Sequence, residues 1–250
     1  MILSKHLSKP RQYEQGWVEF YKLKFKVTPD VLIPRPETEL LVDEVLKFIH
    51  NREYSLNESS SRSATFTILD IGTGTGNIAI SLAKNLILHP CWVIPRTGGD
   101  TKIIATDISA KALKIAKQNA KLHGVLDKIQ FVKSNLLSTK NTQLRKIGTP
   151  TVIVTNLPYI PSERIPYLDP SVKDFEPHVA LDGGSDGFDL YRKLFTQISR
   201  LHPKGVALIV GEIDYTQGDL AYSEAKKYFP EAEVKVKLDL SHKQRILLIQ

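Results

Sequence analysis

A buried strand, a loop of alternating glycines and a helix follow one another without a break near residue 70. The strand is the apolar run Thr67–Ile71, the loop is Gly72-Thr73-Gly74-Thr75-Gly76, and apolar residues at helical spacing begin at Asn77. Such a turn directs backbone N–H groups and the positive end of the helix dipole at an anion. Strand, loop and helix in this order also build parallel sheets covered by helices. The sequence therefore predicts a Rossmann-like α/β fold with a ligand at this loop.

The spacing of the glycines indicates which class of ligand the loop binds. A dinucleotide fingerprint needs a glycine where Asn77 stands, whereas the order here is G-x-G-x-G preceded by Asp70. That variant resembles the first motif of S-adenosylmethionine-dependent methyltransferases, in which the loop receives the methionine carboxylate. A second strand, Lys102 to Thr106, ends at Asp107, whose carboxylate can accept from both ribose hydroxyls. Ser109 is expected to cap the helix that follows. The resemblance implies S-adenosylmethionine as cofactor.

A second motif, Asn156-Leu157-Pro158-Tyr159, closes the β-branched run Thr151–Thr155. The proline ends the ladder and holds Leu157 extended, at the strand end where open α/β sheets bind ligands. The side-chain oxygen of Asn156 and the carbonyl of Leu157 can then accept both N–H bonds of one planar NH2 group, with Tyr159 as a flat wall. A plain strand end with a proline turn would give the same four residues. The glycine loop favours the amine-holding interpretation.

With these motifs the chain resembles the HemK/PrmC family, glutamine N5-methyltransferases that act on class I peptide chain release factors. The match runs from about Pro10 to the C-terminus. Its further motifs are Pro10-Arg11-Gln12-Tyr13 with Gly16, Ile33-Pro34-Arg35-Pro36-Glu37-Thr38-Glu39, Phe175-Glu176-Pro177 with Ala180-Leu181, and Gly211-Glu212. The Pro-Arg-Pro-Glu-Thr-Glu stretch matters most, because Asn-Pro-Pro-Tyr occurs also in adenine-N6 methyltransferases. The resemblance implies methyl transfer to the glutamine of a Gly-Gly-Gln loop.

The resemblance also implies the site residues. Catalysis and substrate binding would fall to Asn156, Leu157, Pro158 and Tyr159, with Arg35 and Glu37 as further substrate-binding residues. Cofactor binding would fall to Asp70, Gly72, Thr73, Gly74, Thr75, Gly76, Asp107, Asn135, Leu136 and Asn156. The family usually has a second proline at Leu157 and an acid at Asn135. Only the backbone carbonyl is needed at Leu157. At Asn135, the side-chain oxygen can still accept a hydrogen bond from the adenine amine. No Cys/His spacing predicts a metal site.

The expected organisation is a short leader and β-hairpin over residues 1–27, then a methyltransferase domain over 28–250. The leader would be a remnant of the linker to the family's N-terminal helical domain, for which about fifteen residues before Gly16 are too few. Weaker release-factor binding is the expected consequence. The mostly parallel, doubly wound sheet would end in an antiparallel hairpin. Predicted strands are 67–71, 103–106, 129–132, 151–155, 206–210, 233–239 and 244–249, and predicted helices are 37–50, 77–87, 109–123, 187–201 and 217–228.

Composition sets the remaining expectations. Cys91 is the sole cysteine of the 250 residues, so no internal disulfide is expected. Without a signal peptide or a membrane-length apolar run, a cytoplasmic protein with no membrane partner is expected. The net charge of +7 leaves direct nucleic-acid binding open without requiring it. Two alternatives remain: an adenine-N6 methyltransferase that clamps a flipped base of RNA or DNA, and a non-catalytic S-adenosylmethionine-binding module, which would not need the Asn-x-Pro-Tyr element.

Overall fold

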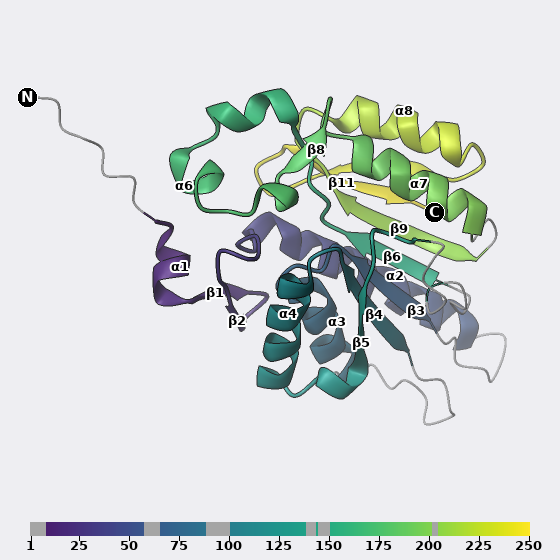
Figure 1. The fold of residues 1–250 in the computed structure, drawn as a ribbon. Helices are drawn as coiled ribbons and strands as arrows, with labels where there is room; N and C mark the ends of the chain where they lie inside the picture. The colour runs from purple at the N-terminus through teal and green to yellow at the C-terminus, as the bar shows by residue number, and fades with distance from the viewer. Residues whose placement is uncertain (1–8, 58–65, 89–100, 139–143, 145–150, 202–204) are drawn as a thin grey trace, which may run out of the picture.

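The computed structural model describes residues 9–57, 66–88, 101–138, 144, 151–201 and 205–250, so part of the predicted leader, residues 1–8, lies outside it. Its centre is a seven-stranded sheet of order β10-β11-β9-β6-β3-β4-β5 (Figure 1). The strands are β3 (Thr67–Ile71), β4 (Lys102–Asp107), β5 (Ile129–Lys133), β6 (Thr151–Thr155), β9 (Val206–Glu212), β10 (Val234–Leu238) and β11 (Gln244–Ile249). β11 runs antiparallel to both β9 and β10, and the pairs among the other strands are parallel. The predicted mostly parallel sheet with a C-terminal antiparallel pair is confirmed.

Helices cover both faces of this sheet (Figure 1). They are α2 (Glu39–Asn57), α3 (Asn77–Leu88), α4 (Ala110–Leu122), α7 (Asp189–Leu201) and α8 (Gly218–Tyr228). Alternate side chains of one strand point to opposite faces. Ile68 of β3 therefore joins the core under α2 and α3, while Leu69 and Ile71 join the core under α7 and α8. This doubly wound arrangement confirms the predicted fold class and brings the carboxyl ends of β3, β4 and β6 to one edge.

A small N-terminal unit packs against the helices. It comprises α1 (Arg11–Gln15) and the antiparallel strands β1 (Trp17–Phe20) and β2 (Leu23–Lys26). Phe20 and Phe25 are buried in the same core as α2 and α3, and Asn119 of α4 exchanges hydrogen bonds with the backbone of Lys26. The Glu39 carboxylate accepts from the backbone N–H of Tyr21 at 2.7 Å. Glu39 therefore holds the hairpin on α2.

The segment between β6 and α7 carries short elements that the sequence did not predict. They are β7 (Ile160–Pro161), the 3-10 helix Ser162–Tyr167, α6 (Pro170–Lys173), the 3-10 helix His178–Ala180 and β8 (Asp182–Gly184). β7 and β8 form a two-stranded parallel sheet just beyond Tyr159. The buried Glu176 carboxylate pairs with Arg35 and accepts from the N–H of Ile33. The segment is thereby fastened to the chain that precedes α2. Among the described residues, no helix is long and apolar enough to span a membrane.

Candidate active site

A pocket opens at the carboxyl ends of β3, β4 and β6, where the predicted ligand-binding motifs meet. The predicted residues that line it are Gly72, Thr73, Gly74, Thr75, Asp107, Asn135, Leu136, Asn156, Leu157 and Pro158. Further lining residues include Val31, Pro34, Thr38, Ser134, Pro177, Val179 and Ala180. Segments that lie far apart in the sequence therefore converge on one cavity, at the edge of the sheet where α/β folds bind ligands.

Gly76 shapes the loop without lining the pocket. Its φ of +81° belongs to the left-handed region that favours glycine. A Cβ atom here would lie 2.9 Å from Ile80 Cδ1 and 3.3 Å from Ala116 Cα. Gly76 therefore allows the close approach of the loop to α4, and its predicted contribution to cofactor binding is indirect in this geometry.

Three N–H groups of the loop, which the sequence pattern directs at a ligand, are already bonded within the protein. Gly72 and Thr73 both donate to the carbonyl of Thr106, at 2.9 and 2.8 Å, and Gly74 donates to Asp107 Oδ2 at 2.9 Å. These bonds fasten the loop to the end of β4. Recognition of an anion would thus rely on the positive end of α3, where Asn77 and Ile78 line the pocket.

Asp70, predicted to bind the cofactor, lies behind the loop and outside the pocket lining. It is fully buried, and its Oδ2 accepts from Thr73 Oγ1 at 2.6 Å and from the N–H of Ala79 at 3.1 Å. Oδ1 has no partner among the described residues. Burial raises the pKa of Asp70 to about 7. The carboxyl group therefore joins strand, loop and helix to one another and does not line the pocket.

The raised pKa of Asp70 predicts a pH dependence of stability. Because the pKa is about 7 in the fold and 3.8 in the unfolded chain, the folded state keeps a proton that the unfolded state releases first. The contribution of Asp70 to stability is therefore full below about pH 4 and falls as pH rises to about 7. We expect the melting temperature of Asp70→Asn, relative to wild type, to rise over this window in thermal denaturation at constant ionic strength. A constant difference would contradict the assignment.

The loop after β5 and the end of β4 form a polar wall of the pocket. Asp107 Oδ1 accepts from the N–H of Ser109 at 2.8 Å, and Ser109 caps α4 as predicted. Burial raises the pKa of Asp107, and backbone hydrogen bonds from Ser109 and Gly74 oppose this. The Ser134 hydroxyl is buried with no partner among the described residues, and the adjoining Asn135 is exposed. Hydrogen-bonding capacity is thus left for a polar ligand.

The Asn156–Tyr159 motif is held by Thr38 and Glu212, for which the sequence predicted no role of their own. The side-chain amide of Asn156 donates to Thr38 Oγ1 at 3.1 Å, and Thr38 donates to Glu212 Oε2 at 2.6 Å. The Tyr159 hydroxyl donates to Glu212 Oε1 at 3.1 Å. Burial and the Glu212 carboxylate raise the pKa of Tyr159, so the phenol stays protonated at neutral pH. Asn156, Leu157 and Pro158 line the pocket, whereas Tyr159 lies outside its lining. Leu157 is buried and Asn156 is half-buried. The roles predicted for the four residues stay predictions.

Arg35 and Glu37, predicted to bind substrate, lie outside the pocket lining. Arg35 is half-buried in its ion pair with Glu176, and Glu37 is exposed on the 3-10 helix Pro36–Thr38. Residues 161–170, which follow the motif, contribute no lining residue to the described pocket. Pro177, Val179 and Ala180 line it instead, and the Arg35–Glu176 pair fastens this segment to the chain before α2. A substrate role for Arg35 and Glu37 stays a prediction.

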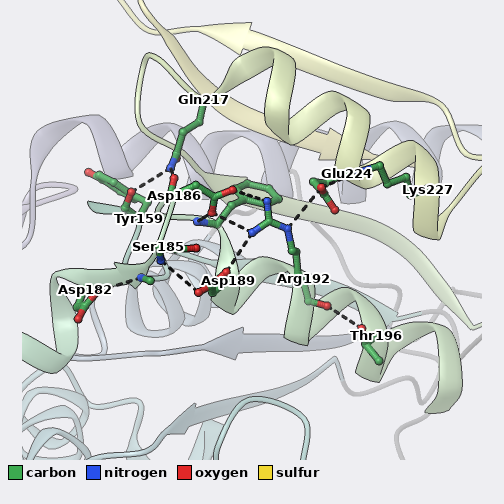
Figure 2. Close-up of polar contacts among 12 residues, drawn as sticks. Tyr159, Asp182, Ser185, Asp186, Asp189, Arg192, Thr196, Gln217, Glu224 and Lys227 are labelled. Carbon is green, nitrogen blue, oxygen red and sulfur yellow. Dashed lines mark hydrogen bonds and ion pairs between the residues drawn. The ribbon is translucent and has the colours of Figure 1, made fainter. Parts of the chain in front are cut away.

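A polar network lies behind the motif (Figure 2). The side-chain amide of Gln217 donates to the carbonyls of Tyr159 and Asp186, at 3.0 and 3.1 Å. The Arg192 guanidinium bonds to Asp186 and Asp189 and lies 3.4 Å from Glu224. It lowers the pKa of Asp186 to about 2. These contacts fasten the β8–α7 turn to the backbone just after Pro158.

The fold and its glycine loop define a methyltransferase domain. Residues 62–244 match a family described as "Methyltransferase domain". The catalytic domain of human METTL16, solved with an RNA hairpin, superposes with a TM-score of 0.64 at 14% identity, over 92% of this chain and 76% of that one. A ribosomal protein L11 methylase from Lactobacillus delbrueckii subsp. bulgaricus gives 0.51 at 20% identity, over 90% and 83%. At these identities the likeness concerns the fold alone.

Sequence relatives identify the family. The release factor glutamine methyltransferase of Bacillus cereus is 35% identical over 251 residues, which cover 100% of this chain and 79% of that protein. The protein of the same name from Moorella thermoacetica is 36% identical over 239 residues, covering 96% and 74%. The chain belongs to the release factor glutamine methyltransferase family, as its motifs predicted.

Proposed function

We propose that this protein transfers the methyl group of S-adenosylmethionine to the side-chain amide nitrogen of the glutamine in the Gly-Gly-Gln motif of a class I peptide chain release factor. One observation supports this best. The Asn156 amide nitrogen is turned toward Thr38, so its Oδ1 and the neighbouring Leu157 carbonyl are the acceptors available to a substrate NH2 group. Relatives that align with 96% to 100% of this chain are named release factor glutamine methyltransferases.

The pocket suits an adenosyl cofactor. Asp107 offers a carboxylate for the ribose hydroxyls, Asn135 an amide for the adenine amine, and buried Leu136 an apolar face. The Ser134 hydroxyl, which has no partner in the described part of the chain, and the positive end of α3 add capacity for further polar groups. S-adenosylmethionine would supply an electrophilic methyl group there.

The protein's own contribution would be positioning and electrostatics. A carboxamide nitrogen is a poor nucleophile, because its lone pair is delocalised into the carbonyl. Asn156 and Leu157 would hold both N–H bonds so that the lone pair faces the methyl group. The same two oxygens stabilise the positive charge that develops on the nitrogen. Because Tyr159 stays protonated it is no base, and the proton would leave to water after transfer.

A methyl-transfer assay that locates the methylated residue tests this function. The protein is incubated with S-adenosylmethionine labelled in its methyl group, together with separated release factor, ribosomal protein and RNA. We expect label in the release factor, located by mass spectrometry on the glutamine of Gly-Gly-Gln, and none in a factor that carries Gln→Ala there. Label on RNA would favour an adenine-N6 methyltransferase, and label on another residue of the factor would also reject the proposal.

A further inference from the structure

A chain of hydrogen bonds connects Glu212, at the end of β9, to Asn156, at the end of β6. Glu212 Oε2 accepts from Thr38 Oγ1 at 2.6 Å, and Thr38 Oγ1 accepts from Asn156 Nδ2 at 3.1 Å. Thr38 and Glu212 are 2% and 1% exposed. Water therefore competes little for either group. In such surroundings each hydrogen bond is stronger than it would be at the surface, and reversing one costs more free energy.

The direction of these bonds determines which end of the Asn156 amide faces the pocket. A threonine hydroxyl has one hydrogen. Burial raises the pKa of Glu212, whereas its hydrogen bonds from Thr38 and Tyr159 favour the ionised form, in which the carboxylate can only accept. Thr38 gives its hydrogen to Glu212, so toward Asn156 it can only accept. A reversed amide would set Asn156 Oδ1 against Thr38 Oγ1, two acceptors with no hydrogen between them. The nitrogen must therefore face Thr38, which leaves Oδ1 for another donor.

Glu212 is itself held in place from two other sides. Its Oε1 accepts from the Tyr159 hydroxyl at 3.1 Å, and its backbone carbonyl accepts from the Tyr191 hydroxyl at 2.5 Å. The preceding Gly211 allows this approach, because a Cβ atom there would lie 2.6 Å from the Tyr191 oxygen. One carboxylate thus determines both the direction of the Asn156 amide and the position of the Tyr159 ring.

We propose that Thr38 and Glu212 are positioning residues, which act through Asn156 and hold its Oδ1 toward the substrate nitrogen. This inference rests on the proposed function, in which Asn156 Oδ1 accepts from the substrate amide. Neither residue would touch the reacting atoms. Their loss should therefore lower kcat and leave the affinity for S-adenosylmethionine nearly unchanged.

The first test is a double-mutant cycle on Thr38 and Asn156. Thr38→Val keeps the shape and removes the hydroxyl, and we expect kcat to fall about tenfold or more, because one preorganised electrostatic partner loses its orientation. Thr38→Ser keeps the hydroxyl and should restore kcat to within about threefold of wild type. Because Thr38 acts through Asn156, Thr38→Val combined with Asn156→Ala should be no slower than Asn156→Ala alone. Independent, multiplied losses would overturn the inference.

Glu212→Gln is a second variant that does not alter Thr38. A glutamine can present either its oxygen or its nitrogen to Thr38, so the hydrogen of Thr38 is no longer committed and the Asn156 amide loses its fixed direction. We expect a fall in kcat without a matching rise in KM for S-adenosylmethionine. Glu44→Gln is the matched control, since Glu44 pairs with Lys237 on another face and should leave kcat unchanged. A kcat of Glu212→Gln equal to wild type would contradict the proposal.

A measurement without turnover separates this inference from the proposed function. In 15N-labelled protein, the side-chain amide signals absent from Asn156→Ala belong to Asn156. One of its two protons should exchange slowly with solvent in wild type and in Thr38→Ser, and faster in Thr38→Val. Equal exchange in all three would reject the positioning role even if the release factor is methylated. Slow exchange with no methylation of the factor would reject the proposed function and leave the hydrogen-bond chain intact.

Discussion

Replacing Asn156 with alanine is expected to lower turnover by about two orders of magnitude or more, the usual cost of one preorganised electrostatic partner. The variant loses the side-chain oxygen that would orient the substrate amide and stabilise its developing charge. Affinity for S-adenosylmethionine should stay close to wild type, because the carboxylate of Asp107 and the start of α3 are untouched. Single-turnover rates give the first quantity, and calorimetric titration with the cofactor gives the second.

Asn85→Ala is the matched control for this change. Asn85 lies on α3 outside the pocket lining, and its side chain donates to the carbonyl of Ser81 at 2.8 Å. The control therefore removes an amide and one hydrogen bond without altering the proposed acceptor pair. We expect a small loss of stability and no change in turnover. Unchanged turnover in Asn156→Ala would remove this residue from the mechanism.

Much of the fold was readable from local signals, because buried parallel strands are continuous apolar runs and helix ends carry capping residues. Thr67–Ile71 and Thr151–Thr155 lie where predicted, and Ser109 caps α4. The short elements between residues 160 and 184 were missed. A two-residue strand such as Ile160–Pro161 has no periodicity to detect, and its pairing with residues 182–184 depends on the tertiary fold.

In the site, too, the features that are contiguous in sequence could be predicted, and those that depend on the tertiary fold could not. The motif Asn156–Tyr159 and the glycine loop were found because each is contiguous in sequence. The Thr38–Asn156 bond joins residues 118 positions apart, so no local pattern could predict it. Asp70 was expected at the ligand because it precedes the loop, but strand alternation turns its side chain beneath the loop toward Thr73 and Ala79. Asp70 therefore lies next to the predicted loop but outside the pocket lining, and its contact with a cofactor stays a prediction.

The second large effect is expected at Gly187, in the turn between β8 and α7. Gly187 has φ +79°, and a Cβ atom there would lie 2.1 Å from the Tyr159 carbonyl oxygen and 2.6 Å from Gln217 Nε2. Because Tyr159 contributes backbone at this contact, Gly187→Ala must displace the motif or break the Gln217 bond to it. A displacement near 1 Å costs about a hundredfold in rate, and we expect turnover to fall by that order.

Gly124→Ala separates the clash from the cost of the backbone conformation. Gly124 has φ +69° and nothing within 4 Å of the added Cβ atom, so alanine there meets only the left-handed penalty, roughly 1 kcal/mol. Gly187→Ala should lose that amount and, from overpacking, about 1–3 kcal/mol more. Thermal denaturation and turnover are measured for both variants, so that the effect of the steric clash at Gly187 is separated from the backbone cost that the two share. If Gly187→Ala were no less stable than Gly124→Ala and equally active, the turn would not be what holds the Tyr159 backbone. Turnover lost in Gly187→Ala alone would mean that the acceptor pair depends on support from a turn outside the pocket.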